Sequence, residues 1–295
     1  MAKTVALPAY FNIGALYAFT GAVVGHDGHP TDNHFIFDFK HLHFVDGSGL
    51  TVFCNTLEWL LSLGVQCQFQ NHANINPAIS YLDDCGFFRR HLGQQLKFNA
   101  TVRGTTLPFT RVAHAEAHGW LEYNFTPWMG YKLGCNHGAL GSLRACVGEL
   151  FNNILDHSTQ EIGFVHVQHY PAPNHIQITL SDFGKGIPSN IRARFGPMLD
   201  GDAIWKASQE GVTSQSVPRN QGIGLNFLVD SVTGNEGYVS IFSFQGSLTC
   251  YKVAGAGVTR VPSTRNASYP GTLINITLPI AKFVGDDDDE ETMEW

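Results

Sequence analysis

The stretch ELFNNILDH, residues 149–157, decides how the C-terminal half of the chain is expected to fold. It closes a helical pattern that begins at Gly138. Glu149, Asn153 and His157 are four residues apart, so a helix places their side chains on one face. This face suits a magnesium–nucleotide site, since Asn offers Mg²⁺ a neutral oxygen and Glu can polarise water. An amphipathic helix with a polar solvent face is the alternative explanation.

A strand that ends in an acidic, glycine-rich turn comes next. The segment SDFGKGIP, residues 181–188, follows the strand pattern of residues 175–181. Gly184 and Gly186 permit positive φ angles and a close backbone approach, and the Asp182 carboxylate can accept a hydrogen bond from an adenine amino group. The segment predicts an adenine-binding turn, with an ordinary glycine-rich turn as the alternative.

A third segment, NQGIGL at residues 220–225, places two glycines before a helix. Backbone N–H groups at a helix N-terminus can face phosphate groups. Gly222 and Gly224 are therefore candidate phosphate-binding residues, although a GxG pair also occurs in ordinary turns.

In this order, the segments resemble the Bergerat-fold ATPases, the GHKL group that includes gyrase and the histidine kinases. The resemblance extends from about Leu133 to Pro279 and includes PGT at residues 270–272. It implies an α/β sandwich with a mixed sheet and helices on one face. It also implies ATP and Mg²⁺ as cofactors, and a mobile lid within residues 195–221.

The same resemblance gives each candidate residue a role. Glu149 takes the general-base position and Asn153 takes the Mg²⁺ position. The ATP-binding residues that it implies are Asn153, His157, Asp182, Gly184, Gly186, Arg219, Gly222, Gly224 and Thr272. Residues 182–184 also spell the DFG of eukaryote-like protein kinases. The chain has neither an HRD-type loop nor a GxGxxG–lysine pair near its start, which excludes that fold.

The N-terminal part alternates strand and helix patterns. Residues 34–39 and 65–69 have strand-like composition. Residues 50–63 carry apolar side chains at helical spacing, and residues 77–85 begin with Pro and are followed by Gly86. Short connections between such elements imply parallel βαβ packing, so we expect two α/β domains in the chain.

The turn FVDGSGL, residues 44–50, resembles the Asp-Ser-Ser-Gly turn of STAS domains, which occur in anti-sigma factor antagonists. The resemblance covers residues 35–88. In the antagonists the second Ser of this turn receives a phosphate. Ser48 occupies that place, while Gly47 replaces the first Ser. A helix that begins there tolerates negative charge at its N-terminus. A role for Ser48 as the helix N-cap is the alternative.

The boundary between the two domains is expected at residues 103–108, where Gly104 and Pro108 interrupt a polar stretch. This gives a STAS-like domain at residues 1–105 and an ATPase domain at residues 106–285. Residues 286–295 form an acidic tail, whose like charges predict solvation.

The composition limits the classes of partner and the cellular compartment that we expect. A net charge of −7 and a pI near 6.0 argue against nucleic acid and anionic membranes as partners. Residues 5–24 are apolar but are interrupted by Pro8 and Gly14, which favours a core helix over a membrane anchor. Six cysteines without a CxxC pair indicate reduced thiols in a cytoplasmic protein. The fourteen histidines lack zinc-type spacing, so surface or hydrogen-bonded histidines explain them better than a structural zinc.

The leading hypothesis is an ATP-binding regulator that hydrolyses ATP or phosphorylates a serine. The resemblance points to a kinase of anti-sigma-factor type, with Ser48 as a candidate phosphoacceptor in its own STAS-like domain. No phosphoacceptor helix of the histidine-kinase type is evident. The alternative is an ATP-gated interaction switch with little or no turnover, whose STAS-like domain docks a regulatory protein. A nucleotide-gated homodimer is a third possibility.

Overall fold

The computed structural model describes residues 2–212 and 224–285, and the side chains of residue 114 and residues 152–163 lie outside this description. Helices and strands alternate along the chain, which confirms the α/β class predicted from the sequence. Arg219, Gly222 and the acidic tail at residues 286–295 also lie outside the described residues.

The N-terminal half is built around a small parallel sheet. Strands β1 (Lys3–Ala6), β3 (His34–Asp38) and β5 (Gln66–Gln70) pair in the order β1-β3-β5, and β2 (Tyr10–Phe11) pairs with β4 (Phe44–Val45). The helices of this half are η1 (Ile13–Ala15), α1 (Leu16–Val23), α2 (Gly47–Ser62), α3 (Pro77–Asp84) and α4 (Phe87–Leu92). The parallel pairing of β3 and β5 confirms the predicted βαβ arrangement.

Side-chain caps fix where the N-terminal helices begin. The Asp46 carboxylate accepts a hydrogen bond from the Gly49 N–H at 2.9 Å, which caps α2. Asn76 caps α3 through its side-chain oxygen, and Pro77 stands in the first turn. The first apolar stretch differs from the expected single core helix. Its backbone forms β2 and η1 before α1, because Asn12 caps a short turn ahead of the helix.

The C-terminal half contains a five-stranded sheet. Its strands β6 (Thr106–Ala113), β7 (Ser158–Tyr170), β8 (His175–Gly184), β9 (Tyr238–Val253) and β10 (Gly257–Pro279) lie in the order β6-β7-β8-β10-β9. Every pairing in this sheet is antiparallel, which corrects the expected mixed sheet. For two of these pairings, β7 with β8 and β9 with β10, the reason is local. The connections at residues 171–174 and 254–256 are too short for a crossover, so they return the chain directly beside itself.

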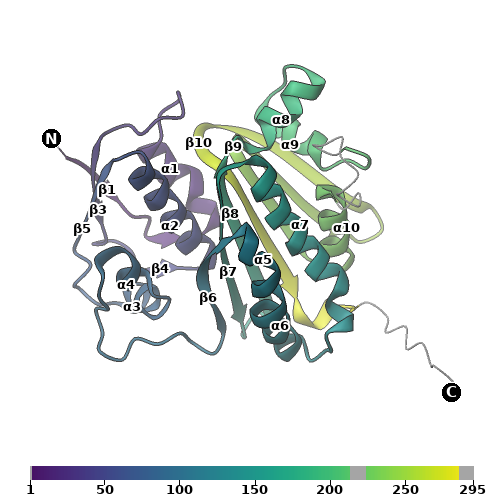
Figure 1. The fold of residues 1–295 in the computed structure, drawn as a ribbon, viewed down its shortest axis with the longest axis horizontal. Helices are drawn as coiled ribbons and strands as arrows, with labels where there is room; N and C mark the ends of the chain where they lie inside the picture. The colour runs from purple at the N-terminus through teal and green to yellow at the C-terminus, as the bar shows by residue number, and fades with distance from the viewer. Residues whose placement is uncertain (1, 213–223, 286–295) are drawn as a thin grey trace.

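Helices of the C-terminal half cover one face of this sheet. They are α5 (His114–Trp120), η2 (Leu121–Phe125), α6 (Thr126–Leu133), η3 (Gly138–Leu140), α7 (Gly141–His157) and α10 (Leu225–Gly234). Figure 1 shows α7 and α10 next to each other, and the two helices are in contact. Their apolar side chains share a core with alternate residues of the strands. This core includes Val147 and Leu150 of α7, Val229 of α10, and Val165, Ile178 and Ile274 of the strands.

The opposite face of the same sheet is covered by the N-terminal half (Figure 1). Helix α2 packs on β7 and β8, and α1 packs on β10. Tyr269 and Leu273 of β10 belong to the N-terminal core, whereas Ile274 belongs to the C-terminal core. The helices of the C-terminal half thus lie on one face, as expected. The second face is occupied by α1 and α2, so the two halves share the sheet.

Two further helices lie against the β9–β10 hairpin, α8 (Gly186–Phe195) and α9 (Asp200–Ala207). Glycines let α9 approach the strands closely. A Cβ atom on Gly246 would lie 2.5 Å from the Asp200 carbonyl carbon, and one on Gly201 would lie 2.5 Å from the Ser263 oxygen. The short helix is therefore held in place by backbone contacts that a larger side chain would block. The last helical element is η4 (Ile280–Lys282).

Two further features concern the described part of the chain. None of its helices combines the length and the apolar character that a membrane crossing requires. All six cysteines are free thiols, and burial raises the pKa of the Cys54 thiol.

Candidate nucleotide-binding site

Asp182 lies near the end of β8, where the strand leads into the glycine-rich turn. Its partner across the sheet is Thr272 of β10, and Asp182 Oδ1 accepts a hydrogen bond from the Thr272 N–H at 3.3 Å. The carboxyl group lies deep among protein atoms, although part of the residue reaches solvent. Burial raises its pKa to about 7, and the Thr272 N–H opposes this rise. The structure thus brings two predicted adenine-binding residues into direct contact.

Gly271 allows Thr272 to reach this position. Its φ angle is 98°, in the region that favours glycine, and a Cβ atom would lie 2.2 Å from the Asp182 carbonyl oxygen. The pairing of β10 with β9 shifts register between Tyr269 and Thr272, so a bulge surrounds the glycine. The bulge turns the Thr272 N–H towards the Asp182 carboxylate.

The turn after Asp182 is equally constrained. Strand β8 ends at Gly184, and Gly186 begins α8 with a φ angle of 65°. A Cβ atom on Gly186 would lie 2.5 Å from Ser243 Oγ. Ser243 Oγ accepts the Ile187 N–H at 3.1 Å and donates to the Gly271 carbonyl oxygen at 2.8 Å. This hydroxyl therefore joins the two glycine turns.

Ser243 was missed by sequence reasoning, although β9 carries a signal for it. Val239 and Ile241 point into the core at alternate positions, and Ser243 continues the same face as a buried polar residue. A hydroxyl at a core-facing position needs a hydrogen-bond partner, and here the partners are the two turns.

Helix α7 presents the residues of the opening motif. The helix predicted from Gly138 to His157 is observed from Gly141 to His157. Glu149 is partly exposed, and it has interactions with its surroundings. The side chains of Asn153 and His157 lie outside the description. Their backbone still locates them, because Ser158, the residue after His157, pairs with Gly184. The end of α7 therefore meets the end of β8.

Helix α10 begins at the same end of the sheet. Gly224 stands at its N-cap position with extended backbone. The helix ends at Gly234, and β9 then starts at Tyr238, opposite Thr277 of β10. Ten helical residues span about 15 Å. The start of α10 therefore lies towards Thr272.

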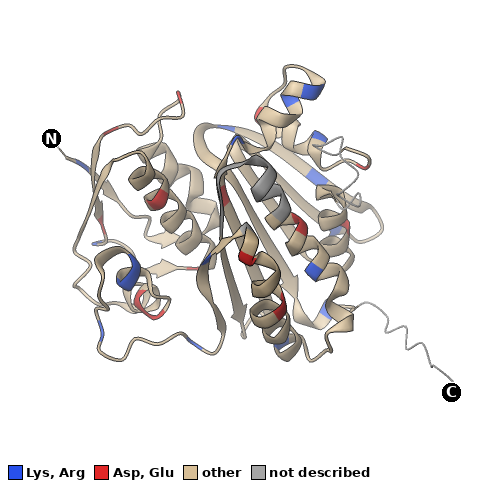
Figure 2. Cartoon of the chain, viewed as in Figure 1, with Lys and Arg blue, Asp and Glu red and all other residues tan. Residues whose placement is uncertain are grey.

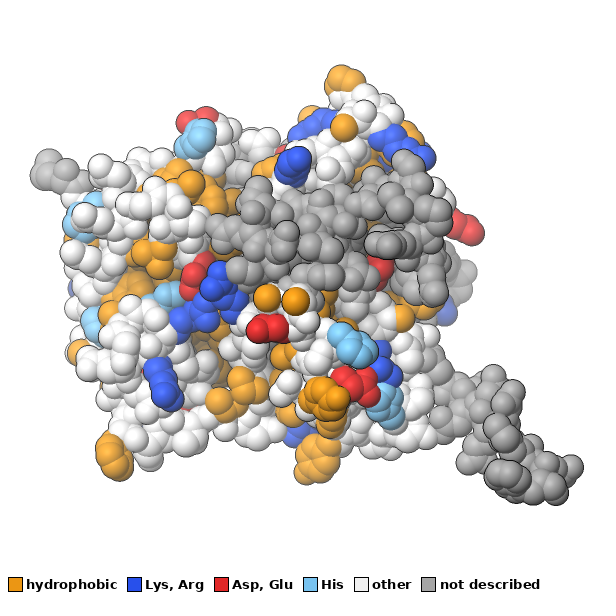
Figure 3. Space-filling model, in the orientation of Figure 1, with side chains coloured by type: hydrophobic (Ala, Val, Ile, Leu, Met, Phe, Trp, Pro, Cys, Tyr) orange, Lys and Arg blue, Asp and Glu red, His pale blue; other side chains and the backbone are white. Residues whose placement is uncertain are grey.

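Basic side chains lie on the helices that follow the turn. Figure 2 shows Lys and Arg on α8 and α9, and Figure 3 shows basic and apolar side chains on this end of the molecule. Arg194 Cζ and Lys206 Nζ lie 5.1 and 5.2 Å from the centroid of the Phe195 ring. Arg192 forms an ion pair with Asp200. Positive charge near the turn would attract a polyphosphate.

Ser48, the candidate phosphoacceptor, is fully buried in the first turn of α2. Its hydroxyl donates to Asp46 Oδ1 at 2.6 Å. Asp46 is the N-cap of α2, so the N-cap role considered for Ser48 is wrong. A Cβ atom on Gly47 would lie 2.4 Å from His166 Nδ1 of β7. In this arrangement the helix start is pressed against the sheet, and a phosphate on Ser48 has no room.

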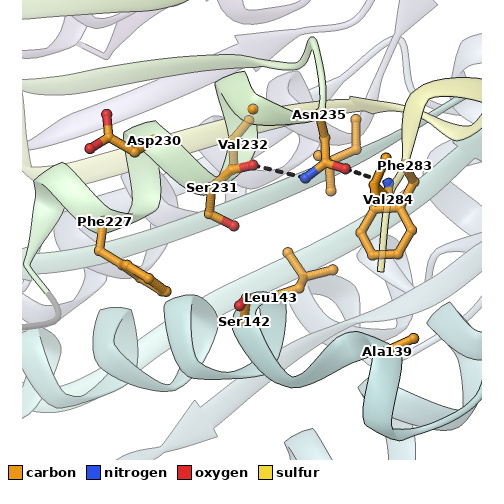
Figure 4. A pocket seen from close by; sticks show the side chains of 12 residues that line it. Ala139, Ser142, Leu143, Phe227, Asp230, Ser231, Val232, Asn235, Phe283 and Val284 are labelled. Atoms are coloured by element: carbon orange, nitrogen blue, oxygen red, sulfur yellow. Dashed lines mark hydrogen bonds between the residues drawn. The ribbon is translucent and has the colours of Figure 1, made fainter. Parts of the chain in front are cut away.

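A cavity of about 290 Å³ lies between α7, α10 and the segment at Phe283 and Val284 (Figure 4). Ser142 and Leu143 of α7 face Ser231 of α10 and its C-cap residue Asn235 across it. These residues lie at the start of α7 and the end of α10, whereas the Asp182 site lies at their other ends. Of the predicted ATP-site residues that the structure describes, none lines this cavity.

Comparison with known proteins gives distant similarity among solved structures. No family model matches the chain. No curated protein matches it either. Among solved structures, the ATPase region of Saccharomyces cerevisiae topoisomerase II is similar with a TM-score of 0.31 and 10% sequence identity. The alignment covers 52% of this chain and 40% of that chain, so less than half of that structure is matched.

Proposed function

We propose that the chain binds ATP at the Asp182 end of β8. The observation that carries the proposal is the Asp182 carboxyl group, which is buried at the edge of solvent and has one oxygen engaged by the Thr272 N–H. The second oxygen can accept a hydrogen bond from the amino group of adenine. An adenine amino group and a backbone N–H are both donors, so the ionised carboxylate is the form that satisfies both.

The phosphates would lie towards the start of α10. Backbone N–H groups at a helix N-terminus attract phosphate, and Gly224 keeps this approach open. Gly184 and Gly186 let the backbone pass close to the nucleotide, and the proposal assigns Gly222 and Arg219 to the phosphates as well. Mg²⁺ needs few protein ligands when phosphates supply the remainder. The proposal assigns this role to the amide oxygen of Asn153.

The proposed activity is phosphoryl transfer from ATP to water or to a serine hydroxyl, in a regulatory protein of anti-sigma-factor type. Glu149 on α7 would accept the proton from the attacking oxygen, and the residue is partly exposed, which suits that task. Mg²⁺ would supply charge stabilisation on the phosphates. The proposal includes the STAS-like character of residues 1–105, a regulatory protein partner, a homodimer and a cytoplasmic location.

A second candidate is an ATP-gated interaction switch with little or no turnover. The burial of Ser48 favours it, because a phosphoryl group cannot reach this hydroxyl while α2 rests on the sheet. The contact between α2 and the sheet would then be the element that responds to nucleotide. In this version residues 1–105 bind the partner once α2 has left the sheet.

Equilibrium titration with ATP and GTP, in the presence of Mg²⁺, tests the binding proposal. We expect saturable ATP binding and weaker GTP binding, since GTP carries a carbonyl oxygen where adenine carries the amino donor. Equal affinity for both nucleotides, or no binding of either, would contradict it. Phosphate release and labelling of Ser48, compared with a Ser48→Ala variant, then separate the ATPase, the kinase and the switch.

A further inference from the structure

Helix α2 reaches the Asp182 site from the face of the sheet that does not carry α7. Asn55 lies in the middle of α2 and is completely buried. Its Nδ2 donates to the Tyr269 hydroxyl oxygen at 2.6 Å and to the Asp182 carbonyl oxygen at 3.4 Å. One side-chain amide therefore contacts both strands that form the candidate adenine site.

Hydrogen bonds continue from Tyr269 towards Thr272. The Tyr269 oxygen accepts from Asn55, so its hydroxyl hydrogen is available to Ser181 Oγ at 2.6 Å. The Ser181 hydroxyl donates to the Thr272 carbonyl oxygen at 3.3 Å, and the Thr272 N–H donates to Asp182. Chains of this kind strengthen each member, because each bond polarises the next. This series of hydrogen bonds, from Asn55 through Tyr269 and Ser181, thus positions Thr272, whose N–H contacts Asp182.

Burial of the Asn55 amide costs folding free energy, and packing alone does not explain why an amide stands at this position. Its Oδ1 is buried and has no hydrogen-bond partner among the described residues. Rotation of the amide would give Oδ1 the Tyr269 hydroxyl and leave the amide nitrogen unpaired instead. A leucine of similar size would avoid either unpaired group. The amide at this position is therefore explained by its contacts with Tyr269 and Asp182.

The sheet face beneath α2 is polar along its centre. Buried polar side chains occupy alternate positions of three strands there, namely His166, Gln168, Gln177, Thr179, Ser181 and Asn275. Interfaces between units that move against each other are typically more polar than cores. Directional hydrogen bonds also fix the position of α2 along the sheet more strictly than apolar contacts do.

From these contacts we infer that Asn55 is a positioning residue for the Asp182 carboxylate. Through Tyr269 and Ser181 it couples the position of α2 on the sheet to nucleotide binding on the other face of the sheet. As far as nucleotide is concerned, the inference rests on the proposed function. When α2 shifts, the series of hydrogen bonds from Asn55 to Thr272 is broken. The Thr272 N–H is then no longer aligned with the Asp182 carboxylate. The N-terminal half is therefore a regulator of the candidate site.

Two substitutions on the full chain test this role. Asn55→Leu removes the amide and keeps its approximate volume, and Tyr269→Phe removes only the hydroxyl. Tyr81→Phe is the matched control, because the Tyr81 hydroxyl is also buried in this interface, where it contacts Gln168 and His166. For each variant we would measure the Asp182 carboxyl pKa by a ¹³C NMR pH titration, the affinity for ATP, and the unfolding temperature.

We expect the first two variants to raise the Asp182 carboxyl pKa by about half a unit or more, because the Thr272 N–H no longer stabilises the ionised form as well. Their ATP dissociation constants should rise about fivefold, the loss typical of one weakened hydrogen bond. Asn55→Leu should keep the unfolding temperature of the wild type or exceed it. Tyr81→Phe should change neither the pKa nor the affinity.

The inference is overturned if the Asp182 pKa stays at the wild-type value in both variants, or if Tyr81→Phe moves it equally. The NMR titration needs no nucleotide. If the wild type binds no ATP while the pKa shifts as expected, the proposed function fails and the positioning role stands. If ATP binds and the pKa does not move, the proposed function stands and the positioning role fails. Should Asn55→Leu not fold, Tyr269→Phe alone decides.

Discussion

Replacement of Asp182 by Asn probes the candidate site through both stability and binding. The folded-state pKa of about 7 lies roughly 3 units above the ordinary aspartate value of 3.8. At about 1.4 kcal/mol per unit, keeping this carboxylate ionised in the fold costs about 4 kcal/mol. The folded state binds the Asp182 proton more tightly than the unfolded chain does. The stability that this protonation contributes is fully present below pH 3.8 and is lost as the pH rises through 7. Between pH 5 and pH 8 the wild type should lose about 2.5 kcal/mol of unfolding free energy through this group.

The Asp182→Asn variant has no such titration. Denaturant unfolding at pH 5, 6, 7 and 8 should show the wild type falling relative to the variant, with the steepest fall between pH 5 and pH 7. At pH 8 the variant should be at least as stable as the wild type. Its ATP affinity at the same pH should fall by about 10- to 100-fold. An amide must point its NH₂ group at one of two donors, the Thr272 N–H or the adenine amino group.

These two results together separate binding from folding. A variant that is stable but binds ATP weakly identifies Asp182 as a contact to the nucleotide. The reasoning is refuted if the variant binds ATP as tightly as the wild type at pH 8. It is also refuted if the stability difference between the two proteins does not change with pH.

Three further substitutions, one of them with a control variant, test separate parts of the proposal. Glu149→Gln should slow phosphate release by about 100-fold or more while ATP affinity is kept, and equal turnover would remove Glu149 as the base. Gly271→Ala should lower the unfolding free energy by more than about 2 kcal/mol, because φ is 98° and the new Cβ meets a backbone oxygen; Gly255→Ala, with φ of 78° and open space, should cost about 1 kcal/mol. Gly47→Ala should displace α2 from His166 and speed limited proteolysis of the N-terminal half, and an unchanged digestion pattern would refute that contact.

The elements that sequence patterns predict best are those with strong local signals. The α7 helix follows from its apolar period, and its end at His157 is observed as predicted. The parallel N-terminal sheet follows from alternating strands and helices joined by short connections. The mixed C-terminal sheet was expected from the resemblance to the Bergerat-fold ATPases, and the observed pairings are antiparallel.

The contact between the two halves was not predictable for a physical reason. Strands β7 and β8 alternate apolar and polar residues, a pattern typical of a sheet with one face in water. The pattern identifies a polar face without specifying what covers it. Here the cover is α2, whose Asn55 reaches Tyr269, a residue 214 positions away in the chain. The burial of Ser48 follows from the same long-range contact.

Within the candidate site, sequence reasoning located the groups but not their connections. Asp182 and Thr272 came from separate motifs, and their pairing across β8 and β10 is a matter of register. The role of Ser243 depends on two glycine turns that meet only in the folded chain. Such hydrogen bonds depend on tertiary geometry, which a one-dimensional pattern does not contain.

The most direct test of ATP binding at Asp182 is the ¹³C chemical shift of its carboxyl carbon at pH 6.5, with and without saturating ATP. Without nucleotide the group should be mostly protonated, since its pKa is about 7. Bound ATP places a second donor on the carboxylate and should move the shift to that of the ionised form. An unchanged shift in the presence of ATP would contradict the proposal that adenine contacts Asp182.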